Sequence, residues 1–269
     1  MSAPPQTLDL TYFATGFIAW CAIFSLTRRA SKDTWSAYNI SYRDQWEWLT
    51  RCISIVHAAF VSWFALPWLL TLWHAPAYLG SLPSASMVVS VSISFFTFDL
   101  ILFSFADYRV AMKWKQAAEN ALAKHEPVPK RPYPIGGAVY IVHHFFAALG
   151  CFLSLHFQCM PISLAVGIAF EVTTPFLNAI WLTEQTRTNS GPLYYAVGYA
   201  FLAFWVVFRL GASAWCLYEL ITTWHAAAAV LPGFIMAFFA VAVPGFNALN
   251  WFWFYKIVAK AMRPPKQKA

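Results

Sequence analysis

Two adjacent histidines, His143 and His144, and one aspartate, Asp99, are the residues of this chain whose types could support catalysis. An imidazole near neutral pH can act as a base or a nucleophile, and a carboxylate beside it fixes the tautomer and stabilises the imidazolium. Because neighbours on a helix point about 100° apart, we expect one histidine to line a chamber while a neighbouring helix holds the other. The alternative is that both histidines only join helices through hydrogen bonds.

These three residues interrupt long apolar stretches, where an ionisable group costs at least about 2.5–3.5 kcal/mol and therefore marks a candidate site. The other polar residues inside such stretches are expected to bind substrate or lipid: His57, Glu171, Asn178, Arg209, Asn247 and Asn250. At about 1.5 Å per helical residue, Asp99, His143 and His144 lie about 10 Å from the same end of their helices. Glu171 and Arg209 differ in depth by roughly 3–9 Å. We expect these two to interact directly or through one water or polar side chain.

The elements that must position these residues are seven apolar stretches, each long enough to cross a bilayer, which takes about 20 residues. They cover residues 10–26, 52–73, 86–106, 137–157, 160–182, 192–221 and 228–258. The chain is 60% hydrophobic and 11% charged, whereas soluble proteins are about 25% charged. We therefore predict an all-α membrane protein with seven transmembrane helices.

Positive charge is confined to one side of this predicted bundle. Of the 18 Lys and Arg residues, all but Arg209 lie in or beside the loops after the first, third and fifth stretches, or at and beyond the end of the seventh. The positive-inside rule places that side in the cytosol, with the N-terminus lumenal and the C-terminus cytosolic. A chamber at the level of Asp99 would then face the cytosol. This location also accounts for the basic excess without a nucleic-acid partner.

The connecting segments carry further expectations. The loop 107–136 is predicted to start with an interfacial helix over 109–125, and its four prolines then favour an extended return. Pro67, Pro175, Pro232 and Pro244 lie inside the predicted spans and should kink them. The five cysteines include no CxxC pair, so neither a metal site nor redox chemistry is expected. No basic segment precedes the first apolar stretch, which should therefore stay as an anchor.

Several short segments resemble the TLC domain, the membrane domain shared by ceramide synthases and the translocating-chain-associated membrane protein. They are residues 51–58 (RCISIVHA), 95–100 (FFTFDL), 143–144 (HH), 170–178 (FEVTTPFLN) and 249–254 (LNWFWF). The resemblance implies a TLC-type helical barrel over residues 45–260, after an N-terminal anchor helix and loop in 1–44 and before a basic tail in 261–269. It is closer to the small TLC-domain proteins than to ceramide synthases. The latter carry His-Asp-x-x-Asp where this chain has Phe170-Glu171-Val172-Thr173-Thr174.

By this resemblance, His143, His144 and Asp99 match the catalytic positions of ceramide synthases, which transfer a fatty acyl group from acyl-CoA to a sphingoid amine. The resemblance implies acyl-CoA as donor, a lipid amine or hydroxyl as acceptor, and residence in the endoplasmic reticulum. Because only one acid remains at Glu171, a non-catalytic protein that binds, senses or carries a lipid is the alternative. A seven-helix receptor is disfavoured, since the last stretch has no mid-membrane Lys for a retinal. The sequence leaves open whether copies of the chain form a homo-oligomer.

Overall fold

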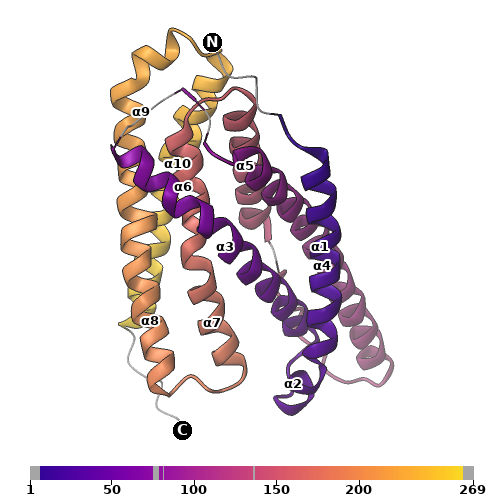
Figure 1. Cartoon of the computed structure of the whole chain (residues 1–269). Helices are drawn as coiled ribbons and strands as arrows, with labels where there is room; N and C mark the ends of the chain where they lie inside the picture. The colour runs from indigo at the N-terminus through magenta and orange to yellow at the C-terminus, as the bar shows by residue number, and fades with distance from the viewer. Residues whose placement is uncertain (1–6, 75–78, 81, 136, 263–269) are drawn as a thin grey trace.

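The protein is a bundle of helices (Figure 1), described here by a computed structural model over residues 7–74, 79–80, 82–135 and 137–262. In chain order the elements are α1 (Leu10–Ala30), α2 (Lys32–Ala37), α3 (Tyr42–His74), α4 (Ala85–Ala123), α5 (Gly137–His156), α6 (Pro161–Ala169), η1 (Phe170–Thr173), α7 (Thr174–Gln185), α8 (Pro192–Phe204), η2 (Trp205–Gly211), α9 (Ala212–Ala228) and α10 (Gly233–Ala261). Within those residues the sole strand-like pairing is an isolated bridge between Leu79 and Cys159. The all-α prediction is confirmed.

Six helical segments of the described chain are long and apolar enough to cross a membrane. They are Leu10–Ala30, Tyr42–His74, Ala85–Ala123, Pro161–Gln185, Pro192–Ala228 and Gly233–Ala259. A shorter apolar helix, Tyr140–His156, lies within α5. The chain is therefore an integral, multi-pass membrane protein. Most of the predicted basic tail, 261–269, and the first six residues of the N-terminal segment lie outside the described residues.

Two of the long segments are not uniform α-helices. The segment from α6 to α7 passes through η1, a 3-10 turn at Phe170–Thr173, just before Pro175. Proline has no N–H to donate and crowds the preceding turn, so a change of helix type at this point is expected. The segment from α8 to α9 passes through η2, a π-helix at Trp205–Gly211. Such π segments are rare and are often found at functional sites.

The connecting segments match the expectations in part. The predicted helix over 109–125 is present to Ala123 as the C-terminal part of α4, which continues without a break for 39 residues from Ala85, and its interfacial position stays a prediction. The kink expected at Pro232 is wrong, because α9 ends at Ala228 and α10 begins only at Gly233. The return after α4 is irregular over residues 126–134, and a hydrogen bond from the Ile135 amide to Asp107 Oδ1 at 2.7 Å holds its end against α4.

Close packing of small residues fixes α4 against its neighbours. Gly16 of α1 faces α4 so closely that an added Cβ would lie 2.5 Å from Ser94 Oγ, and one turn later Trp20 Nε1 donates to that same oxygen at 3.0 Å. Small residues and side-chain hydrogen bonds at helix crossings are the usual means of association in membranes. On the other side of the bundle most residues of α6 are buried, within an apolar cluster that α3, α4, α5 and α9 share. The resulting frame holds α4 and α5 side by side.

Candidate functional site

Asp99 lies at the centre of a polar group formed by α4 and α5. Its side chain is fully buried. Tyr140 donates its hydroxyl proton to Asp99 Oδ2 at 2.5 Å, and His144 Nδ1 lies 3.5 Å from the same oxygen. That second distance marks a polar contact rather than a well-formed hydrogen bond. Tyr140 and His144 are four residues apart on α5 and so share one face, with their ring centroids 3.9 Å apart.

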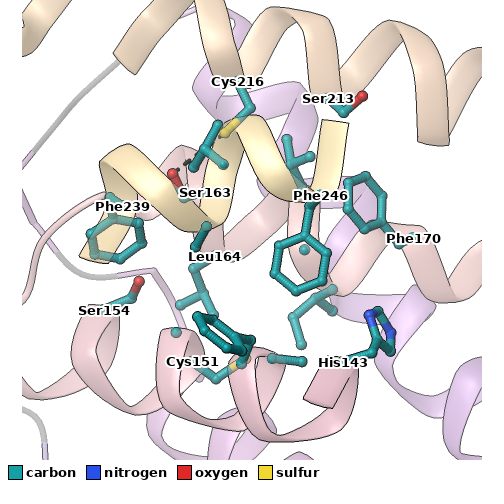
Figure 2. Close-up of a pocket in the computed structure, with 18 of the residues that line it drawn as sticks. His143, Cys151, Ser154, Ser163, Leu164, Phe170, Ser213, Cys216, Phe239 and Phe246 are labelled. Carbon is teal, nitrogen blue, oxygen red and sulfur yellow. Dashed lines mark hydrogen bonds between the residues drawn. The ribbon is translucent and has the colours of Figure 1, made fainter. Parts of the chain in front are cut away.

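His143 faces away from this group. Its ring meets Phe246 and Trp253 of α10, at centroid distances of 5.3 and 5.9 Å, and its side chain lines a pocket (Figure 2). The divergence follows from the 100° step between helical neighbours. One histidine thus lines a cavity while α4 holds the other, as the sequence led us to expect.

The pocket lies between α5, the α6–η1 segment, α9 and α10. It encloses about 840 Å³ of space not filled by atoms, counting the space at its mouth. Phenylalanines contribute much of its wall: Phe96, Phe146, Phe170, Phe238, Phe239 and Phe246. His143 and Ser154 both line it, and the eleven helical steps between them correspond to about 16 Å along α5. Figure 2 shows His143 at one end and Ser154 at the other. This shape and lining suit an extended apolar chain.

Glu171 reaches the pocket from the 3-10 turn η1. Its side chain lines the cavity, and Oε2 accepts a hydrogen bond from Thr174 Oγ1 at 2.9 Å. The turn results from Pro175, so the proline that sequence analysis treated as a simple kink also sets the direction of Glu171. This acid therefore lies within the wall of the pocket that His143 lines.

Arg209 lies on the π-helix η2 and is only 7% exposed. Its Nε donates to Thr173 Oγ1 at 2.9 Å, and Nη1 lies 3.5 Å from Asn250 Oδ1. The guanidinium carbon lies over the ring of Trp205, 4.7 Å from its centroid. Within the described residues Arg209 forms no ion pair, so the direct form of the expected contact with Glu171 is not found, and the water-mediated form stays a prediction. The two charges interact at longer range, and each side chain bonds a different threonine, Thr173 for Arg209 and Thr174 for Glu171.

Comparison with known protein families shows which family contains this arrangement of helices. The family model described as the TLC domain matches residues 47–259. The chain belongs to the TLC-domain family. No curated protein matches the chain. The TLC domain thus contains α3 to α10 almost completely, with the Asp99 group and the pocket inside it.

Other predicted site residues of the TLC domain lie away from the pocket wall. His57 is fully buried and stacks on Phe95, with ring centroids 3.9 Å apart, and its Nε2 lies 3.4 Å from Ser92 Oγ. Asn178 joins α7 to α3, since its Oδ1 accepts from Arg51 Nη1 at 2.9 Å and its Nδ2 donates to the Arg51 carbonyl. These contacts join α3 to α4 and to α7, and the predicted lipid-binding role of His57 and Asn178 stays a prediction.

The two asparagines of α10 differ in burial. Asn250 is 1% exposed and lies beside Arg209, whereas Asn247 is half-buried. Neither is part of the pocket wall. No group of three or more His, Cys, Asp or Glu side chains in the described part of the TLC domain is arranged to hold a metal ion.

Sequence analysis missed Tyr140, Thr173 and Trp205. Tyr140 precedes His144 by four residues, a spacing that could have indicated a shared face. Thr173 and Trp205 gave no comparable signal, because a threonine or a tryptophan inside an apolar stretch is ordinary. Their contacts with Arg209 depend on the 3-10 and π segments, which the hydrophobic pattern does not reveal.

Proposed function

We propose that this TLC-domain protein transfers a fatty acyl group from an acyl thioester, with acyl-CoA as donor, to a lipid amine or hydroxyl. The observation that carries the proposal is the position of His143 at one end of a phenylalanine-lined pocket. An acyl tail in that pocket would place its carbonyl carbon at the imidazole. The ceramide synthase resemblance supplies the donor class.

Two routes are open to His143. As a general base, its imidazole takes the proton from the acceptor, whose nitrogen or oxygen attacks the thioester carbonyl; the C–S bond breaks, and the imidazolium returns the proton to the departing thiolate. As a nucleophile, the imidazole nitrogen itself forms a bond to the acyl carbon and the thiolate leaves; the acceptor then attacks the acyl-imidazole and loses its proton.

His144, Asp99 and Tyr140 act in this proposal as positioning residues. They hold α5 against α4 through the contacts to Asp99 Oδ2. Because His143 directly precedes His144, the rotation of α5 that satisfies His144 also directs His143 into the pocket. Replacement of the Asp99 carboxylate would therefore affect the reaction by changing the orientation of His143.

The proposal includes seven spans and a cytosolic entry for the donor. The 20 residues of α5 extend about 30 Å, the thickness of the hydrocarbon core, although α4 beside it is longer, with 39 residues. With α5 as the seventh span, the N-terminus is lumenal and every predicted cytosolic loop carries positive charge. The endoplasmic reticulum follows from the family resemblance. We include in this proposal that the pocket lined by His143 opens toward the cytosol.

One observation favours the alternative of a non-catalytic lipid carrier or sensor. Asp99 contacts His144, whereas the pocket-lining His143 has no contact with a carboxylate among the described residues, and its Nδ1 has no hydrogen-bond partner there. A base usually has an acid that stabilises its protonated form. A protein that only encloses an acyl chain would not need one.

A direct assay separates the two functions. Purified protein in lipid nanodiscs is incubated with radiolabelled palmitoyl-CoA and a mixture of lipid amines and alcohols, and products are identified by mass. We expect an acylated lipid that His143→Ala abolishes. Tight retention of palmitate or palmitoyl-CoA with no product, unchanged by His143→Ala, would refute acyl transfer and support the carrier.

A further inference from the structure

Arg209 is a buried cation whose direct partners in the described chain are neutral. It contacts Thr173 and Asn250 through hydrogen bonds and the rings of Phe170 and Trp205 through its guanidinium face. A charge inside a membrane protein is costly and usually marks an ion or substrate site. Glu171 does not neutralise it by contact.

Two more donors beside Arg209 have no partner. Asn250 Nδ2 and Trp205 Nε1 are buried and form no hydrogen bond within the described structure; these side chains are 1% and 3% exposed. An amide nitrogen and an indole nitrogen can only donate. Buried donors are rarely left unpaired. Arg209, Asn250 and Trp205, called here the Arg209 cluster, therefore present a positive charge and two unpaired N–H donors, and no described residue places an anion in contact with them.

The Arg209 cluster adjoins the His143 end of the pocket. Phe170 lines the pocket, and its ring centroid lies 5.4 Å from the Arg209 guanidinium carbon. Ser213 also lines the pocket and donates its hydroxyl to the Arg209 carbonyl. On the other side, Trp253 packs against both His143 and Trp205, at centroid distances of 5.9 and 6.4 Å. A charged group at this end would thus be next to an apolar chamber.

We propose that the Arg209 cluster binds the anionic headgroup, a carboxylate or a phosphate, of a single-chain lipid whose tail occupies the pocket. An arginine fork with flanking N–H donors matches the planar or tetrahedral oxygens of such groups. The phenylalanine-lined cavity accepts the tail. This inference goes beyond the proposed acyl transfer, because the binding requires no reaction.

The test compares three lipids of equal tail length: palmitate, 1-palmitoyl-lysophosphatidic acid and neutral 1-palmitoylglycerol. Each is titrated into the full chain in nanodiscs, with binding read from quenching of a fluorescent fatty-acid probe. Asn250→Asp is the decisive variant. It keeps the side-chain shape but places a carboxylate against Arg209, which satisfies the cation internally and repels an anionic headgroup.

For the wild type we expect at least one anionic lipid to bind roughly tenfold more tightly than the neutral one. Asn250→Asp and Arg209→Met should each remove that preference while leaving 1-palmitoylglycerol binding unchanged, and the exposed control Arg29→Met should preserve it. Preference for palmitate identifies a carboxylate, and preference for lysophosphatidic acid identifies a phosphate. If Arg209→Met fails to fold, Asn250→Asp decides alone. Equal binding of all three lipids, or a preference that survives Asn250→Asp, would overturn the inference.

Discussion

The two adjacent histidines should differ in what their truncation affects most. His144→Ala should mainly lower stability, and His143→Ala should mainly abolish activity. His144 is 5% exposed and packs against the rings of Tyr140 and Phe96, at centroid distances of 3.9 and 5.1 Å. His144→Ala therefore opens a new cavity in the core and removes the polar contact to Asp99. Buried large-to-small changes cost about 2–5 kcal/mol. We expect a loss of about 3 kcal/mol for His144→Ala, which is more than a hundredfold in the unfolding equilibrium.

His143→Ala only enlarges a pocket that already exists. His143 is half-buried, and its Nδ1 gives up no hydrogen bond to another described residue. We expect a loss of about 1 kcal/mol or less, as for substitutions that neither create a core cavity nor unpair a buried group. Acyl transfer, in contrast, should disappear with His143→Ala and be reduced with His144→Ala.

Each variant serves as the control for the other, because both replace a histidine with alanine at consecutive positions of one helix. Stability is measured by reversible unfolding in mixed micelles with increasing sodium dodecyl sulfate, followed by tryptophan fluorescence. Activity is measured with palmitoyl-CoA in nanodiscs. Equal losses of stability, or a larger loss for His143→Ala, would show that the assignment of one histidine to the pocket and the other to the core is incorrect.

Three further outcomes follow from the packing and the charges. Tyr140→Phe should lower the free energy of unfolding by about 1.5–3 kcal/mol, because the hydroxyl donates to a buried carboxylate; the same unfolding titration checks this, and an unchanged midpoint contradicts it. Gly16→Ala should destabilise by about 1–3 kcal/mol because its Cβ would overlap α4. The matched Gly198→Ala, whose Cβ meets nothing within 4 Å, should stabilise by about 0.5–1 kcal/mol, and both should be compared by thermal shift. In sealed microsomes, added protease should cut residues 124–135 while an N-terminal tag stays protected; cleavage of both would reverse the proposed sidedness.

Much of the architecture could be predicted from the sequence because it depends on local composition. Apolar runs of about 20 residues must form helices in a bilayer, where every backbone N–H and C=O needs an internal partner. Six of the seven predicted spans, the membrane class and the family all followed from such runs and from short segments in fixed order. The same argument singled out Asp99, His143, His144, Glu171 and Arg209, since an ionisable group is unusual in that setting.

The partners of these residues were decided only by tertiary structure. Hydrophobic runs give the length of a helix but not its rotation about its axis or the neighbour it meets, which depend on side chains far apart in the chain. Sequence spacing showed that His143 and His144 diverge, but packing of α5 against α4 and α10 decided which one lines the pocket. A direct Glu171–Arg209 contact is not formed, for a related reason. The 3-10 turn before Pro175 and the π segment around Arg209 each shift side-chain direction by a fraction of a turn, and a uniform helical rise does not include such a shift.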